Sequence, residues 1–171
     1  MKILFVTMTI EPVNGGGLVE QTLQLARHVR KAGIECHILT TDSGITLQDL
    51  DALRREGLQI TALRCICARF YFPILSISTI TKLISEADVV LLMGHWTIIN
   101  VIAYIVAKYL DKRYVVCPAG ALSIYGRSKT LKALFNFVIG KRIIVNAHGH
   151  IAVGENEIPQ FKAYGVAEDK V

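Results

Sequence analysis

Apolar and amphipathic segments alternate along the chain, and the N-terminal part shows the pattern most clearly. An apolar run at 2–7 leads into glycines at 15–17, then an amphipathic segment at 17–32 and a second apolar run at 35–40. Short apolar runs separated by helix-length segments predict buried parallel strands joined by helices. The pattern therefore predicts a strand, a loop, a helix and a second strand. The loop is made largely of glycines, which have no side chain.

The same alternation continues to the C-terminus. We predict strands at 2–7, 35–40, 58–63, 88–92, 114–117 and 150–153, and helices at 17–32, 47–56, 77–86, 97–110, 129–146 and 155–164. Thr46 and Asp49 have the spacing of a capping box at the start of the second helix, and Gly33 and Gly57 are typical helix ends. Six strands alternating with helices predict an α/β domain with a doubly wound, mostly parallel, Rossmann-like sheet and helices on both faces.

One uncharged stretch has the length of a membrane span. Residues 89–107 carry no charged side chain, but the polar turn at 94–100 divides the stretch near its centre. A strand followed by a helix explains both halves, and the N-terminus lacks the composition of a signal peptide. We therefore expect a cytoplasmic protein, either free or peripheral at the inner face of the membrane.

The charge of the chain is unevenly distributed. Its 171 residues have a formal net charge of +5. A basic cluster lies around the fifth predicted helix and consists of Arg127, Lys129, Lys132, Lys141 and Arg142. These side chains are either the solvated face of a helix or a surface attracted to anionic phospholipid headgroups. Nucleic acid is disfavoured as a partner, because no binding motif occurs and aromatic residues do not interleave with the basic ones.

Metal and redox chemistry have little support in the sequence. The cysteines at 36, 65, 67 and 117 lie in apolar runs without CxxC or zinc-knuckle spacing, so we expect buried, reduced thiols. His148 and His150 have no third ligand nearby and indicate the start of a strand instead of a metal site. We predict no metal site.

The glycine-rich loop is the main candidate for ligand binding. Residues 14–17 read Asn-Gly-Gly-Gly, which is neither GxGxxG nor a P-loop, so a complete dinucleotide site is disfavoured. Backbone N–H groups at the start of the following helix can still stabilise negative charge. A second loop, Arg69 to Pro73, is aromatic, and it either lines a ligand crevice or packs on the surface.

Taken together, these motifs resemble the N-terminal half of GT-B glycosyltransferases, most of all the retaining enzymes of glycosyltransferase family 4. The first unit contributes Pro12, the glycines at 15–17, Glu20 and Gly33. Later matches are Gly94-His95-Trp96, the turn Cys117-Pro118-Ala119-Gly120-Ala121-Leu122, the segment from His150 to Glu155, and Gly165. Each motif is modest by itself, but the resemblance covers essentially the whole chain.

The resemblance implies that residues 1–171 are the acceptor-binding lobe of a two-lobed enzyme. A C-terminal donor-binding lobe, absent from this chain, would be its partner. The full enzyme would transfer a sugar from a nucleoside-diphosphate sugar to a glycan or lipid-linked acceptor, without a cofactor or metal. We expect the isolated lobe to be inactive, and its uncovered cleft face to favour self-association.

The resemblance also implies roles for individual residues. Gly15, Gly16 and Gly17 would approach the donor diphosphate, while His95 and Glu11 are the predicted catalytic residues. The predicted acceptor-binding residues are Trp96, Ala119, Gly120, Tyr125 and Arg127. Ala119 stands where the family has a cleft histidine. His95, in a neighbouring loop, either replaces that histidine or is a structural residue beneath Trp96.

Two alternatives belong to other functional classes. The chain as it stands fits a non-catalytic Rossmann-like binding module or a subunit of a split glycosyltransferase, which Ala119 and the missing lobe both favour. An NAD-binding domain is disfavoured by the glycine spacing. A donor-lobe sequence in the downstream reading frame would favour the enzyme.

Overall fold

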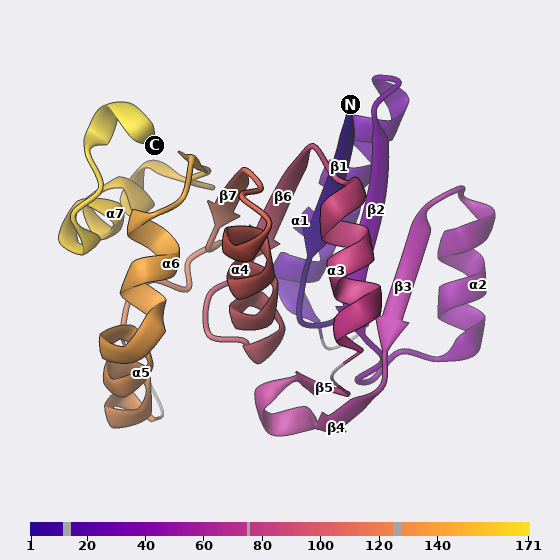
Figure 1. Cartoon of the computed structure of the whole chain (residues 1–171), viewed down its shortest axis with the longest axis horizontal. Coiled ribbons are helices and arrows are strands. Elements are labelled where there is room, and N and C mark those ends of the chain that lie inside the picture. The colour runs from indigo at the N-terminus through magenta and orange to yellow at the C-terminus, as the bar shows by residue number, and fades with distance from the viewer. Residues whose placement is uncertain (12–14, 75, 125–127) are drawn as a thin grey trace.

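Figure 1 shows a computed structural model of the chain, which describes residues 1–11, 15–74, 76–124 and 128–171. The centre is a six-stranded sheet in the order β3-β2-β1-β6-β7-β8, and every neighbouring pair is parallel. Its strands are β1 (Lys2–Val6), β2 (Glu35–Thr41), β3 (Gln59–Leu63), β6 (Val89–Met93), β7 (Tyr114–Cys117) and β8 (Gly149–His150). The predicted doubly wound, Rossmann-like sheet is confirmed.

Helices connect the strands at nearly the predicted positions. They are α1 (Gly16–Lys31), α2 (Leu47–Arg55), α3 (Ile77–Glu86), α4 (Ile98–Tyr109), α5 (Lys129–Phe135), α6 (Lys141–Val145) and α7 (Ile158–Tyr164). A π-helical segment, Asn136–Gly140, joins α5 to α6, so the predicted helix at 129–146 is one rod with a wider turn in its middle. Single 3₁₀ turns occur at Ala68–Phe70, Glu155–Glu157 and Glu168–Lys170.

The sheet separates two hydrophobic cores. Successive residues of a strand point to opposite faces, so Leu4 and Val6 pack in one core and Phe5 in the other. Helices α3, α4, α6 and α7 cover the first face, and α1 and α2 cover the second. Apolar residues are needed on both faces of these strands, which explains their nearly continuous apolar runs.

The segment at 64–76 differs from the expected loop. It contains a small antiparallel hairpin of β4 (Cys65–Cys67) and β5 (Phe72–Pro73). Cys36 and Cys117 are buried as expected, but Cys65 is only partly buried and Cys67 is exposed, and all four thiols are free. The prediction of buried thiols was wrong at these two positions, because a two-stranded hairpin leaves much of its surface in water.

The predicted last strand at 150–153 is also shorter than expected. It reduces to Gly149–His150, which pair with β7, and confirms the strand start at the two histidines. No helix in the described ranges is long and apolar enough to span a bilayer. The uncharged stretch at 89–107 divides into β6 and α4.

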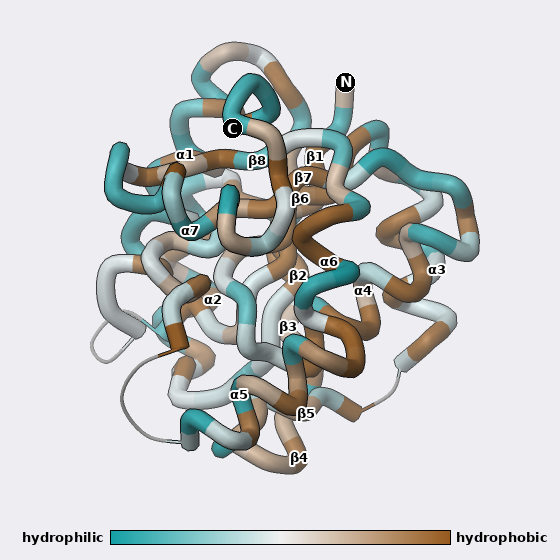
Figure 2. Tube along the Cα trace, turned by 90° about the vertical axis from the view of Figure 1, so that its left-hand side faces the viewer, coloured by the Kyte–Doolittle hydropathy of each residue, from teal (hydrophilic) through white to brown (hydrophobic). Residues whose placement is uncertain are grey.

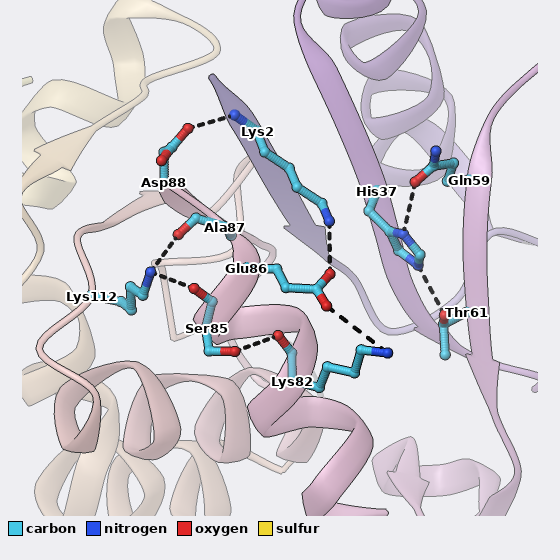
Figure 3. Close-up of polar contacts among 10 residues, drawn as sticks. All are labelled: Lys2, His37, Gln59, Thr61, Lys82, Ser85, Glu86, Ala87, Asp88 and Lys112. Atoms are coloured by element: carbon cyan, nitrogen blue, oxygen red, sulfur yellow. Dashed lines mark hydrogen bonds and ion pairs between the residues drawn. The ribbon is translucent and has the colours of Figure 1, made fainter.

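Polar contacts hold the amino-end side of the sheet together (Figure 3). The Lys2 ammonium lies 2.8 Å from the Glu86 carboxylate, and the Lys112 ammonium donates to the carbonyls of Ser85 and Ala87. The His37 ring lies between the side chains of Gln59 and Thr61. These contacts lie at the amino ends of the strands, on the side of the sheet away from the loops at their carboxyl ends.

Candidate functional site

The order of the strands reverses at β1, and this position defines the candidate site. From β1 the chain proceeds to β2 and β3 on one side, and then crosses to β6, β7 and β8 on the other. In open α/β sheets, ligands bind beyond the carboxyl ends of the strands at such a switch point. Figure 2 shows that α5 and the β4–β5 hairpin lie toward one end of the molecule and both termini toward the other.

The loop after β1 closes through a tight backbone turn. The Gly15 N–H donates to the Glu11 carbonyl at 3.1 Å, and a Cβ on Gly15 would lie only 2.3 Å from that oxygen. Gly16 has a φ of +65°, in the left-handed region that favours glycine. Within the described ranges no side chain caps α1, and its first turn has no acidic residue. Its first N–H groups can therefore bind an anion.

The turn after β6 lies against this loop. Gly94 has a φ of +78°, and a Cβ there would lie 3.0 Å from Cδ2 of Leu18, in the first turn of α1. At the end of β7, the Cys117 thiol lies 3.5 Å from the Gln21 side-chain nitrogen, also on α1. The fold thus brings the loop with Gly15–Gly17 and the turn with His95 together at the carboxyl ends of β1 and β6.

Gly94 provides a stability test of this contact. Replacing Gly94 with alanine is expected to lower the free energy of unfolding by about 2 kcal/mol, because alanine is strained at positive φ and its Cβ presses on Leu18. Gly33→Ala is the matched control, since Gly33 has a φ of +77° but open space around it. Urea unfolding should show the larger loss for Gly94→Ala. Equal losses would mean that the turn does not press on α1.

Among the predicted site residues that the structure describes, His95 is the most deeply buried. Its side chain is 2% exposed, and its ring packs edge-on against Trp96 and Phe135, with centroids 4.5 and 5.6 Å away. Burial lowers the pKa of His95 to about 4, while a hydrogen bond with Asn136 acts weakly in the opposite direction. The imidazole is therefore neutral near pH 7.

A chain of hydrogen bonds determines which ring nitrogen carries the proton. The Tyr164 hydroxyl donates to the Leu122 carbonyl at 3.1 Å, so its oxygen accepts from the Asn136 side-chain NH₂ at 2.5 Å. Asn136 then presents its oxygen to Nε2 of His95 at 3.0 Å. Nε2 must donate this bond, which leaves Nδ1 as an acceptor.

This acceptor belongs to a cluster of unsatisfied polar atoms. In the described part of the chain, four buried side-chain polar atoms lack a hydrogen-bond partner. Three of them, His95 Nδ1, Thr97 Oγ1 and Asn100 Oδ1, lie within one turn and the start of α4. Buried polar atoms are normally paired, so this cluster fits a polar ligand or bound water.

The turn after β7 is held by a carboxylate that sequence reasoning missed. Glu157 is 2% exposed; its Oε1 accepts the Gly120 N–H, and its Oε2 accepts the Val153 N–H at 2.6 Å. Ala119 has a φ of +51° in the same turn. The Trp96 indole donates to the Ala121 carbonyl and so connects this turn to the one that carries His95.

The remaining predicted site residues lie elsewhere or outside the described part. Glu11 is buried and packs on the β2–α2 turn, since a Cβ on Gly44 would lie 2.9 Å from Cγ of Glu11. This turn lies on the side of β1 away from β6, so a contact with an acceptor beside His95 stays a prediction. Tyr125 and Arg127 lie outside the described residues. The described ranges contain no group of three His, Cys, Asp or Glu side chains placed to hold a metal ion.

The sequence model of Glycosyltransferase Family 4 matches residues 15–171. The chain belongs to this family. No curated protein matches it closely enough to count as a relative.

Several solved structures have a fold similar to that of this chain. Anabaena Alr3699/HepE, solved in complex with UDP-glucose, is 16% identical with a TM-score of 0.71, and the match covers 99% of this chain and 42% of that one. MurG of Acinetobacter baumannii is 13% identical with a TM-score of 0.58, over 91% of this chain and 42% of that one. UDP-GlcNAc 2-epimerase of Neisseria meningitidis, bound to UDP-GlcNAc, is 20% identical with a TM-score of 0.59, over 100% and 45%.

These similarities are of fold. The family 4 chain has the α/β architecture of an N-terminal GT-B domain, and it spans less than half the length of these solved structures.

Proposed function

We propose that this family 4 chain is the acceptor-binding lobe of a glycosyltransferase that moves a sugar from a nucleoside diphosphate to a glycan or lipid-linked acceptor. The observation that carries the proposal is the neutral, buried His95, whose unpaired Nδ1 lies in the turn packed on the glycine-lined start of α1. Membership in a glycosyltransferase family supports this class of chemistry. HepE, a similar structure, binds UDP-glucose.

The two sides of the site would have different tasks. The N–H groups of Gly16 and Gly17 would face the departing diphosphate, whose negative charge a helix N-terminus stabilises. With a pKa of about 4, His95 is too weak a base to take up a proton near pH 7. Its Nδ1 would instead accept a hydrogen bond from a hydroxyl and orient the sugar or the acceptor.

The partner in this proposal is a donor-binding lobe. The test is calorimetric titration of the 171-residue chain, beside the protein encoded by the whole reading frame that contains it, with UDP, GDP and their sugars. We expect only the longer protein to bind a nucleotide. Tight binding by this chain alone, or none by either protein, would contradict the proposal and favour a cofactor site or a binding module.

His95 is tested in the longer protein. His95→Ala is expected to lower the rate of sugar transfer by about a hundredfold while leaving nucleotide binding within about twofold, because the histidine orients a hydroxyl and does not hold the nucleotide. His28→Ala, an exposed histidine on α1, is the control. An unchanged rate in His95→Ala would assign the histidine a structural role only.

A further inference from the structure

Hydrogen bonds connect His95 to residues that lie far from it in the sequence. Tyr164 is the last residue of α7, and its ring lies edge-on to the His95 ring, with the centroids 5.8 Å apart. Asn136 is the first residue of the π-helical segment, and its side-chain amide bonds to both the Tyr164 hydroxyl and Nε2 of His95. Figure 1 shows α5, α6 and α7 at the edge of the molecule beyond α4 and β7. This edge therefore reaches the candidate site through one amide group.

The Leu122 carbonyl sets the direction of these bonds. A carbonyl oxygen only accepts, so the Tyr164 hydroxyl, 3.1 Å away, donates its single proton to it. Burial raises the pKa of Tyr164, which keeps this proton on the hydroxyl at neutral pH. The hydroxyl oxygen can then only accept from Asn136. The NH₂ group of the amide therefore faces Tyr164, and its oxygen faces His95.

Tyr164 supplies a preference that the Asn136 amide lacks by itself. The oxygen and the NH₂ group of an amide have nearly the same size and shape, so packing alone leaves both orientations open. Gly140 leaves room for the amide, because a Cβ there would collide with Oδ1 of Asn136. The π-helical turn thus sets the position of the amide, and the Tyr164 hydroxyl sets its orientation.

The orientation matters because a second unpaired atom, at the start of α4, is also an acceptor. Asn100 donates from its side-chain NH₂ to the carbonyls of Met93 and Gly94, at 2.9 and 3.2 Å, and within the described ranges its buried oxygen has no partner. Only a hydrogen-bond donor can pair with this oxygen or with Nδ1 of His95. A hydroxyl group can donate, whereas an ionised phosphate or carboxylate cannot. A proton on Nδ1 would reverse this requirement at His95.

We propose that Tyr164 and Asn136 are positioning residues for the transfer: they hold His95 in the tautomer whose Nδ1 accepts a hydrogen bond from a substrate hydroxyl. Both act through the histidine, from the side of Nε2. Their role in the reaction rests on the proposed function. Their effect on the tautomer does not, so it is tested without donor or acceptor.

The test is nitrogen-15 NMR of the 171-residue chain, labelled at histidine, at pH 8, where His95 is neutral. The two nitrogens of a neutral imidazole resonate far apart, according to which one carries the proton. Signals that His95→Gln removes belong to His95. We expect the proton on Nε2 in the unchanged chain. In Tyr164→Phe the amide can turn over, since phenylalanine has no hydroxyl to accept its NH₂, and both signals should move to about midway between the two positions.

A double variant tests the same mechanism by rescue. In Tyr164→Phe/Asn136→Asp the carboxylate has only acceptor oxygens, so Nε2 must donate in either orientation of the side chain. The His95 signals should return to the positions of the unchanged chain, which general loosening of the core could not cause. A proton on Nδ1 in the unchanged chain, a single tautomer in Tyr164→Phe, or no return in the double variant would each overturn the proposal.

Tyr104→Phe is the matched control. Tyr104 on α4 is also buried, and its hydroxyl accepts from the side chain of another asparagine, Asn146, at 3.2 Å. Its ring packs on Tyr114. This variant should leave the His95 signals in place. The same change in both variants would mean that the tautomer responds to any loss of packing, and would overturn the specific role of Tyr164.

Activity of the longer protein separates this inference from the proposed function. There Tyr164→Phe should lower the rate of sugar transfer by about twofold, in proportion to the tautomer lost, and the double variant should restore it. An unchanged rate in Tyr164→Phe, beside a large loss in His95→Ala, would overturn the positioning role. If His95→Ala also left the rate unchanged, the proposed role of His95 would fail and the positioning role with it, while the effect of Tyr164 on the tautomer would stand.

Discussion

Glu157→Ala is expected to lower the free energy of unfolding by about 3 kcal/mol, measured by urea unfolding near neutral pH. Glu157 is 2% exposed, and its two oxygens accept the backbone N–H groups of Gly120 and Val153. Hydrogen bonds to a charged group contribute about 1.5–3 kcal/mol each, and the variant would leave both donors without this partner. The loss combines weaker binding of the turn with the cost of burying unpaired N–H groups.

Glu155→Ala is the control for this variant. Glu155 is exposed in the same 3₁₀ turn, and its replacement should change stability by no more than about 0.5 kcal/mol. Glu157→Gln should fall between the two, because an amide keeps one acceptor oxygen but turns an NH₂ toward the second N–H. If Glu157→Ala cost no more than Glu155→Ala, the carboxylate would not hold the turn.

The fluorescence of a single tryptophan reports on the turn that Glu157 holds. Trp96 is the only tryptophan, and its indole donates to Ala121 in the turn that Glu157 holds. In Glu157→Ala this turn should loosen and expose the indole to water. The emission of the folded variant should then shift to longer wavelength, whereas that of Glu155→Ala should not.

The sequence predicts the sheet well because the relevant signals are local. β1, β2, β6 and β7 contain apolar runs that are buried on both faces of the sheet, and each strand lies within two residues of its predicted bounds. The predicted capping box is confirmed, with Thr46 and Asp49 each accepting the other's backbone N–H at 3.1 Å. The hairpin of β4 and β5 was missed because strands of three and two residues have no detectable alternation.

The π-helical segment also had no periodic signal. The one residue in the sequence that hints at this segment is Gly140. A Cβ at this position would lie 2.4 Å from Oδ1 of Asn136 and 2.7 Å from the Phe135 ring, so a larger residue would not fit. Glycine allows this close approach in the middle of a helix, where it otherwise costs stability. The wider turn places Asn136 toward His95 while Phe137 faces solvent.

The candidate site likewise has a part that the local sequence predicts and a part that depends on contacts between residues far apart in the sequence. The glycines at 15–17 and His95 follow strands, and their motifs make them candidates from the sequence alone. Their supporting residues were not found, because Asn136 lies 41 positions from His95, and Glu157 lies 37 positions from Gly120. Only the packing of the π-helical segment after α5, and of the 3₁₀ turn before α7, brings these side chains to the site. A polar residue in an amphipathic helix gives no local sign of such a role.

Lowering the pH from 7 to 5 is expected to remove about 2 kcal/mol of stability through His95 alone. The folded protein holds the pKa of this histidine at about 4, below the ordinary value of 6.5. Between these two pH values the unfolded chain therefore binds a proton at His95 that the folded chain does not bind. The contribution is fully present above pH 6.5 and declines as the pH falls toward 4. One pKa unit corresponds to about 1.4 kcal/mol, which limits the total to about 3 kcal/mol.

The measurement compares urea unfolding at pH 7 and pH 5 in the unchanged chain and in His95→Gln. The variant should be less stable at pH 7, yet lose about 2 kcal/mol less on acidification, because glutamine has no proton to bind. Burial also lowers the pKa of His37, but this residue is present in both proteins and cancels in the difference. Equal losses in the two proteins would mean that the His95 imidazole titrates near its ordinary pKa in the folded state. In that case Nδ1 would be able to take up a proton near neutral pH, and His95 would act as a base and not as a neutral hydrogen-bond acceptor.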